Sequence, residues 1–228
     1  DGINSSGGIY VPYLLRKMGV DVIELNCVPN GDFAHDPEPV PENLKDLCQQ
    51  VIEHKAHLGI AIDPDVDRLV LVCNDGSFFG EEYTIVAVVK YILSTRRNAS
   101  VVSNISTTKS VRDIAQSLGA QYFESAVGEI NVVELMKKKQ AVIGGEGSGG
   151  VIFADSHYGR DALVGIALIL SYLSQINQSS KELRSSLPNY FMLKDKIVIS
   201  NGLKFDIDNY ILDQIKYCNE SKQDFSNI

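Results

Sequence analysis

The chain has 228 residues, of which 44% are hydrophobic and 22% are charged, and its formal net charge at pH 7 is -8. This composition is that of an ordinary globular protein, long enough for two modest domains. The negative charge argues against nucleic acid as the main partner. A membrane span needs about 18 consecutive apolar residues, and no stretch of the sequence reaches that length, so no membrane partner is expected either.

The start of the chain and its cysteines indicate a compartment. The chain begins with Asp1 and lacks the basic-then-apolar start of a signal peptide, so we expect its first residues to lie inside a domain. The cysteines are scattered and form no C-x-x-C pair, a pattern that favours buried free thiols in a reducing cytoplasm. They are Cys27, Cys48, Cys73 and Cys218.

Apolar residues recur at spacings that alternate between those of helices and those of strands. The first part of the chain predicts a helix over residues 8–18, a strand over 20–25, a helix over 42–54, strands over 58–62 and 69–73, and a short returning strand over 77–79. The second part predicts helices over residues 82–94, 109–118, 129–139 and 160–173, which alternate with strands over 101–105, 121–124, 141–144 and 151–153. Residues 174–190 indicate a linker, followed by a strand over 196–200 and a helix over 205–218. The continuous apolar run at residues 58–62 is typical of a parallel strand covered on both faces.

This alternation predicts an α/β fold with mixed, mostly parallel sheets. We expect two consecutive α/β sandwich domains and a short C-terminal extension. The first domain would cover residues 1–78 and the second residues 79–187. Residues 188–228 would form a linker and the start of an incomplete further domain.

The segment Asp63-Pro64-Asp65-Val66-Asp67-Arg68 places three carboxylates within five residues, directly after an apolar run. Two carboxylates about 5 Å apart repel by about 3 kcal/mol at an effective dielectric of about 20. A divalent cation reverses that sign, and oxygen donors at alternate positions suit Mg²⁺ or Ca²⁺. The segment therefore predicts a metal loop, in which Arg68 is a fixed cation for a phosphoryl group. A solvated acidic turn is the alternative.

Two other functions fit parts of the same segment. Asp63 and Asp65 have the spacing of the two acids of a haloacid-dehalogenase-like phosphatase, in which Asp63 would be the nucleophile. The third Asp and the Arg that follows it at once fit a metal loop better. A non-catalytic sugar-phosphate-binding module is the other alternative.

A second segment, Gly145-Glu146-Gly147-Ser148-Gly149-Gly150, matches the dinucleotide-binding pattern G-x-G-x-x-G. A dinucleotide site would need a helix to begin here, whereas residues 151–153 predict a strand. Two interpretations remain open. The segment is a flexible hairpin, or it presents Glu146 and Ser148 to sugar hydroxyls on backbone that glycine lets approach closely.

Together the two segments resemble loops of the α-D-phosphohexomutase superfamily, which comprises phosphoglucomutase, phosphomannomutase and phosphoglucosamine mutase. The second domain of that family carries a metal loop of the form D-G-D-G-D-R, similar to residues 63–68, and the third carries a sugar loop of the form G-E-x-S-G-H, similar to residues 145–150. Residues 37–44 resemble the family's P-N-P-x-x-E-N-L segment. The resemblance covers the middle domains two and three.

The resemblance implies an isomerase of carbohydrate metabolism, a phosphotransferase that interconverts hexose 1-phosphate and 6-phosphate with Mg²⁺ as cofactor. It implies that Arg68 contacts the phosphoryl group in catalysis and that Glu146 and Ser148 bind the hexose phosphate substrate. Its metal ligands would be Asp63, Asp65 and Asp67.

The family's phosphoserine loop, T-A-S-H-N, and its phosphate-binding loop, R-x-S-G-T, do not occur in this sequence. The resemblance therefore implies that the remaining domains of a full-length chain are partners of this one, and that this chain alone is inactive. The sequence also departs from the family at Gly150, where the family has His, and at residues 127–130, where many members carry a cation. It does not distinguish glucose, mannose and glucosamine phosphates and indicates no oligomeric state.

Overall fold

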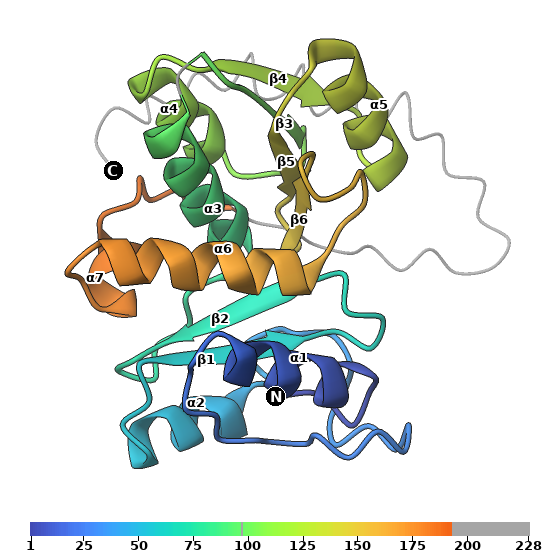
Figure 1. Cartoon of the computed structure of the whole chain (residues 1–228), viewed down its shortest axis with the longest axis vertical. Coiled ribbons are helices and arrows are strands. Elements are labelled where there is room, and N and C mark those ends of the chain that lie inside the picture. The colour runs from blue at the N-terminus through green and yellow to red at the C-terminus, as the bar shows by residue number, and fades with distance from the viewer. Residues whose placement is uncertain (97, 193–228) are drawn as a thin grey trace, which may run out of the picture. The chain divides into compact units, whose positions relative to one another are not determined.

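The computed structural model describes residues 1–96 and 98–192, and the strand and helix predicted beyond residue 192 lie outside the described residues. Residues Asp1–Phe191 form one compact unit. Its helices are α1 (Gly7–Lys17), α2 (Lys45–Glu53), α3 (Glu81–Thr95), α4 (Ser110–Ser117), α5 (Glu129–Lys139), α6 (Ala162–Gln175) and α7 (Ser180–Ser185) (Figure 1). Its strands are β1 (Leu58–Ile62), β2 (Leu69–Cys73), β3 (Ser100–Asn104), β4 (Gln121–Ser125), β5 (Ile143–Glu146) and β6 (Gly150–Phe153). No helix in this described part is long and apolar enough to cross a membrane.

The first sheet consists of β1 and β2, which pair antiparallel along their whole length. Every residue of β2 is buried, because α2 packs on one face of the sheet while α3 and α6 pack on the other. Alternate side chains of a strand point to opposite faces. Leu69 and Leu71 therefore join the core beneath α3, whereas Val70 and Val72 pack against α2. The strand predicted at residues 58–62 is present, but its parallel direction was wrong, because direction depends on the partner strand and not on the apolar run.

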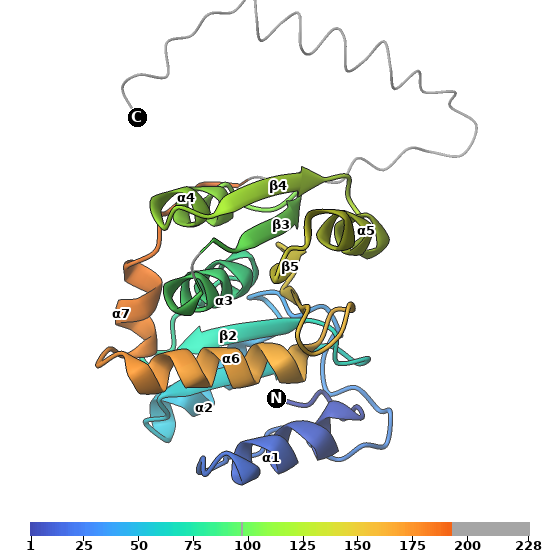
Figure 2. The ribbon, with the colours of Figure 1, turned by 45° about the horizontal axis from the view of Figure 1, so that its top comes forward.

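The second sheet has the strand order β4-β3-β5-β6. Strand β3 pairs parallel with β4 and β5, whereas β5 and β6 form an antiparallel hairpin. Helix α5 covers one face, and α3 and α4 lie on the other (Figure 2). The predicted α/β fold with mixed, mostly parallel strands is confirmed for this sheet.

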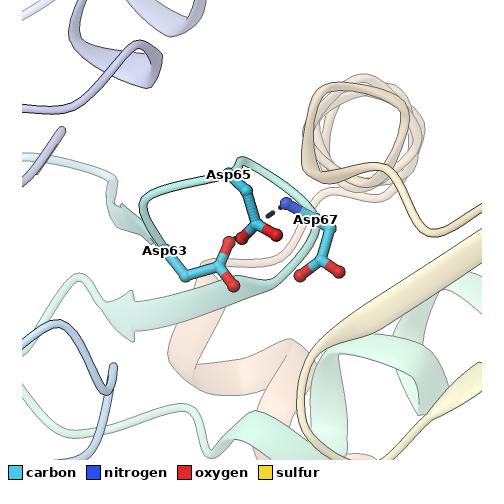
Figure 3. A group of neighbouring side chains, drawn as sticks. All are labelled: Asp63, Asp65 and Asp67. Atoms are coloured by element: carbon cyan, nitrogen blue, oxygen red, sulfur yellow. Dashed lines mark hydrogen bonds between the residues drawn. The ribbon is translucent and has the colours of Figure 1, made fainter. Parts of the chain in front are cut away.

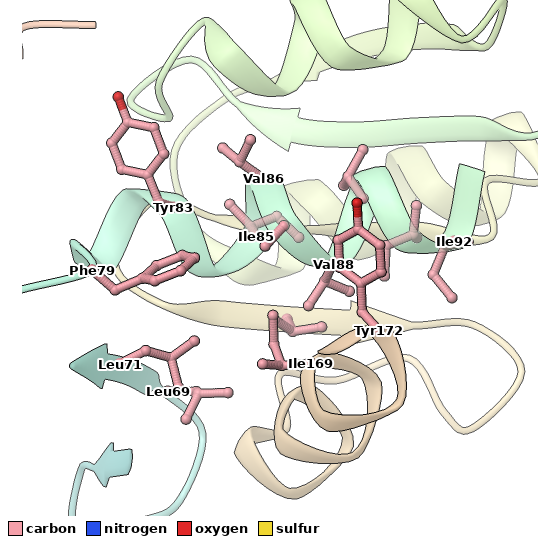
Figure 4. Packing of buried hydrophobic residues seen from close by; sticks show 14 of the residues in the cluster. Leu69, Leu71, Phe79, Tyr83, Ile85, Val86, Val88, Ile92, Ile169 and Tyr172 are labelled. Atoms are coloured by element: carbon pink, nitrogen blue, oxygen red, sulfur yellow. The ribbon is translucent and has the colours of Figure 1, made fainter. Parts of the chain in front are cut away.

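One apolar core extends from the first sheet to the second. Helix α3 lies at its centre, where Ile85 and Val88 are fully buried. Leu71 of β2 and Ile169 of α6 pack into the same core (Figure 4). Because residues on both sides of the predicted boundary at residue 78 share this core, the division into two domains stays a prediction.

Two of the strands predicted within the described residues do not form. Residues 20–25 belong to no strand of the described part of the chain. A strand needs a ladder of backbone hydrogen bonds, but these residues and β1 line a cavity of about 600 Å³ instead of pairing across it. Residues 77–79 make an isolated bridge, between Val72 and Phe78, and no strand.

The linker predicted over residues 174–190 was also wrong, since it contains α7. Ser179 begins this helix with a capping box: its side chain accepts a hydrogen bond from Glu182 N, and the Glu182 carboxylate accepts one from Ser179 N. Leu183 and Leu187 enter the main core and hold the helix against α3. The three cysteines within the described residues are free thiols, of which Cys73 is buried.

We expect Leu71→Ala to lower the free energy of unfolding by about 2–5 kcal/mol, the usual effect of a cavity in a packed core. Leu71 is 0% exposed. Ile130→Ala is the matched control, because Ile130 is 69% exposed and its truncation should change stability by less than about 0.5 kcal/mol. Urea unfolding followed by circular dichroism measures both. Equal losses in the two variants would contradict the packing described here.

Candidate functional site

The acidic segment forms the loop between β1 and β2. One carboxylate oxygen from each of Asp63, Asp65 and Asp67 lies within 4.8 Å of the other two (Figure 3). Asp63 is buried, Asp67 is half-buried and Asp65 is exposed. The structure therefore brings together the three residues that the sequence predicted as metal ligands.

Asp63 organises the loop from its buried position. Its Oδ1 accepts hydrogen bonds from the backbone N–H groups of Asp67 and Arg68, each at 3.0 Å, and its Oδ2 accepts one from Arg68 Nε at 2.6 Å. Burial acts to raise the pKa of Asp63, but these hydrogen bonds from Arg68 and Asp67 outweigh it, and the pKa falls below its usual value. Asp63 is therefore held as a carboxylate.

The neighbouring Asp67 carboxyl is in the opposite situation. Burial raises the pKa of Asp67 to about 7, and the hydrogen bond and negative charge of Asp63 add to the rise, whereas the Arg160 guanidinium opposes it. The like charges of the loop are thus only partly neutralised by the protein. A further cation among these carboxylates would lower the repulsion between them.

Arg68 connects the acidic loop to the long segment before α2. Its Nε bonds to Asp63, and its Nη1 bonds to Glu38 Oε2 at 3.0 Å. These carboxylates raise the pKa of Arg68, although burial alone would lower it. The Arg68 side chain is 23% exposed and its guanidinium is held by both carboxylates, which suits the contact with a phosphoryl group predicted for it.

The backbone of the loop is strained at one position. Val66 has φ of 63°, in the left-handed region that a β-branched residue rarely adopts. Such a conformation costs about 1–3 kcal/mol. The D-G-D-G-D-R form that this loop resembles has glycine at this position, so Val66 keeps the loop's shape without the residue best suited to it.

The second predicted loop is the β5–β6 hairpin. Glu146 is 7% exposed, and its Oε1 accepts hydrogen bonds from Asn104 Nδ2 at 2.6 Å and Gly128 N at 3.3 Å. Its Oε2 accepts one from Arg160 Nη1 at 3.1 Å. Ser148 lies half-buried in the turn. Since a carboxylate has about four acceptor sites, Glu146 keeps room for about one further donor.

The two loops touch through their backbones. Leu69 N donates to Gly149 O at 3.0 Å, and Arg68 and Gly150 form an isolated antiparallel bridge. Gly149 has φ of 94°, and a Cβ atom there would lie 2.6 Å from Leu69 O. Glycine is required at this point because it alone allows so close a contact.

The side chain that joins the two loops, Arg160, was not predicted from the sequence. Arg160, in the segment before α6, donates from Nη2 to Asp67 Oδ2 and from Nη1 to Glu146 Oε2. Asp67 lies 93 residues before Arg160, so no local sequence pattern connects the two residues. The sequence shows only a single arginine next to Asp161, the residue whose side chain caps α6.

Two models of one family match most of the chain. Residues 1–76 match "Phosphoglucomutase/phosphomannomutase, alpha/beta/alpha domain II" and residues 80–191 match "Phosphoglucomutase/phosphomannomutase, alpha/beta/alpha domain III". The chain belongs to the phosphoglucomutase/phosphomannomutase family. The resemblance inferred from the two loops is confirmed at the level of the family and of its two middle domains.

Relatives in this family are identical to the chain at about a third of the aligned positions. A phosphoglucomutase/phosphomannomutase of Thermococcus kodakarensis is 35% identical over 197 residues, which are 86% of this chain and 43% of the relative. A probable phosphoglucosamine mutase of Methanopyrus kandleri is 32% identical over 208 residues, 91% of this chain and 46% of the relative. The chain therefore spans less than half the length of these curated relatives.

A solved structure has the same fold. The phosphoglucomutase/phosphomannomutase family protein of Burkholderia thailandensis superposes with a TM-score of 0.77 at 28% identity, over 83% of this chain and 42% of that one. A putative phosphomannomutase of Thermus thermophilus, at 23% identity, gives a TM-score of 0.71 and supports the fold alone.

Asp63 is buried and Asp65 is exposed, so the organising role of Asp63 can be tested by comparing the two residues. We expect Asp63→Ala to lower the free energy of unfolding by about 2–3 kcal/mol, less than for a fully buried pair because Arg68 is partly exposed. Asp65→Ala, which removes an exposed carboxylate, should change it by less than about 0.5 kcal/mol. Urea unfolding in EDTA measures both. Similar values for the two variants would contradict an organising role for Asp63.

Proposed function

We propose that this chain contributes the metal loop and the sugar loop of a Mg²⁺-dependent phosphohexomutase, an isomerase that interconverts hexose 1-phosphate and hexose 6-phosphate. One observation carries the proposal: Arg160 bonds to both Asp67 and Glu146, so the two loops lie in one site. The family match and the names of the relatives support the same activity. In this proposal residues 1–78 are the second domain of the enzyme and residues 79–187 the third.

The donor set of the acidic loop fits Mg²⁺. Three carboxylates offer oxygen atoms within 4.8 Å of one another, and oxygen is the ligand that Mg²⁺ prefers. Asp65 is exposed, as a ligand that receives an ion from solvent should be. When bound, Mg²⁺ supplies positive charge that neutralises a transferring phosphoryl group.

The chain's own residues orient the reacting groups. Arg68 is held between Asp63 and Glu38, so its guanidinium is preorganised to contact the phosphoryl group. Glu146 is fixed by three hydrogen bonds and has acceptor capacity left for a sugar hydroxyl. Ser148, half-buried in the turn beside it, adds a hydroxyl that both donates and accepts.

The phosphoryl donor would come from outside this chain. We propose that a phosphoserine on a further domain of the full-length protein gives its phosphoryl group to a hexose phosphate, and that the resulting bisphosphate returns the other phosphoryl group to the serine. The chain spans 43% and 46% of two mutase relatives, which supports the presence of further domains in them. The cytoplasmic location stays a prediction.

The geometry does not favour the phosphatase alternative. A nucleophilic carboxylate needs an oxygen that reaches the substrate. Asp63 is 1% exposed, and both of its oxygens accept hydrogen bonds from Asp67 or Arg68. The other alternative is a non-catalytic binding module. Conversion of hexose phosphate by the full-length protein, measured in the next experiment, would exclude it.

In the full-length protein, we expect Asp65→Asn to lower kcat for the conversion of glucose 1-phosphate to glucose 6-phosphate by at least about 100-fold, because charge stabilisation of a phosphoryl group is lost. Glu134→Gln is the matched control, since Glu134 is exposed on α5, and it should leave kcat unchanged. A coupled assay of glucose 6-phosphate formation, with mannose and glucosamine phosphates as alternative substrates, measures the effect. Full activity of Asp65→Asn, or activity that survives EDTA, would overturn the metal assignment.

The 228-residue chain alone should bind Mg²⁺ but turn over no hexose phosphate, because it lacks the serine loop that the family uses. Calorimetric titration with Mg²⁺ and the same coupled assay test this. Turnover by the isolated chain at the rate of the full-length protein would show that the phosphoryl donor lies within these residues.

A further inference from the structure

Arg160 is surrounded by carboxylates from three separate segments. Its Nη2 bonds to Asp67 of the acidic loop, and its Nη1 bonds to Glu146 Oε2 at 3.1 Å. Its Nε lies 3.5 Å from Oε2 of Glu129, the first residue of α5. The side chain is 22% exposed, so these ion pairs are screened less than those of surface arginines.

The surrounding backbone holds Arg160 in this position. Its own N–H donates to Glu129 Oε1 at 2.8 Å. The next two residues are also fixed, since Asp161 N donates to Val151 O at 2.9 Å and Ala162 N donates to Val66 O at 3.0 Å. The base of the side chain is therefore tied to both loops that its guanidinium joins.

Gly150 provides the space for the side chain. A Cβ atom built on Gly150 would lie closer than 3.0 Å to Arg160 Cδ. That atom is in the middle of the arginine side chain, so even alanine at position 150 would force the guanidinium away from its carboxylates. The position of Arg160 thus depends on a glycine in the sugar loop.

The charges determine the sign of the effect of Arg160 on a metal. A divalent cation among Asp63, Asp65 and Asp67 would share Asp67 with the guanidinium. Like charges a few ångströms apart repel strongly even at an effective dielectric of about 20. Arg160 would therefore weaken metal binding, and would weaken it less when Glu146 holds the guanidinium more strongly than Asp67 does.

We propose that Arg160 is a positioning residue, an internal counter-ion that links the acidic loop to Glu146 and sets the affinity of the metal site according to the state of the sugar loop. A sugar hydroxyl that occupies Glu146 would then alter metal affinity, and by linkage the metal would alter sugar affinity by the same factor. This inference rests on the proposed function, because it concerns the same metal loop.

The test is the affinity of the 228-residue chain for Mn²⁺, a paramagnetic substitute for Mg²⁺, measured by the electron paramagnetic resonance signal of the free ion. We expect Arg160→Met to bind Mn²⁺ about tenfold more tightly than the unaltered chain, since a repelling charge is gone. Arg160→Lys keeps the charge and should stay within about threefold of the unaltered chain. Arg16→Met removes an arginine that is 57% exposed and pairs with Glu24, and it should have no effect.

A gain in affinity separates this role from a structural one, because a damaged or unfolded site binds more weakly. Should Arg160→Met fail to fold by circular dichroism, Arg160→Gln carries the same test with a polar neutral side chain. Unchanged or weaker Mn²⁺ binding in the folded neutral variant would overturn the proposal.

A double-mutant cycle tests the link to the sugar loop. Glu146→Gln should weaken Mn²⁺ binding in the unaltered chain, because Arg160 is then left to Asp67. In the Arg160→Met background, the fold-change in Mn²⁺ affinity caused by Glu146→Gln should be at least about three times smaller. That difference would measure the coupling between the two residues. Equal effects in both backgrounds would overturn the link. Absence of Mn²⁺ binding in every variant would instead overturn the metal loop of the proposed function.

Discussion

The site depends on how its crowded carboxylates are neutralised. Arg68 links Asp63 with Glu38, and Arg160 links the acidic loop with Glu146. Each arginine therefore joins segments that are distant in the sequence, and each is less than one quarter exposed. Removing one partner of a partly buried ion pair strongly destabilises the folded protein, because the other charge is left unpaired. Ion pairs on the surface contribute little to stability. The two arginines thus hold in one place the groups that a metal and a sugar phosphate would contact.

The glycines of the second loop have a different role from the one that the sequence predicted. The sequence predicted that they make the hairpin flexible or let a ligand approach the backbone. In the structure they are positions where other protein atoms leave no room: a Cβ atom at Gly145 would lie closer than 3.0 Å to Gly150 O, and one at Gly149 would lie 2.6 Å from Leu69 O. The loop is therefore closely packed, within itself at Gly145 and against β2 at Gly149, while Asn104, Gly128 and Arg160 hold Glu146.

Local pattern and tertiary pairing explain what the sequence could predict. Helices α3 to α6 and the strands between them follow from periodicity, because their apolar residues recur at helix and strand spacings. The acidic loop and Glu146 were found as motifs within single segments. The antiparallel pairing of β1, the missing strand over residues 20–25 and the role of Arg160 depend on partners elsewhere in the chain, such as Asp67, 93 residues from Arg160. No local pattern encodes such a partner.

Both departures from the family's sequence pattern lie in segments that contact Arg160. The family form of the sugar loop ends in His, whereas this chain has Gly150, and any side chain at that position would displace Arg160. The segment at residues 127–130 lacks the cation that many members carry two residues after its glycine, and it carries Glu129, which accepts a hydrogen bond from the backbone N–H of Arg160 and pairs with its Nε. Arg160, from the segment before α6, brings a guanidinium to the place where the hairpin and the start of α5 meet.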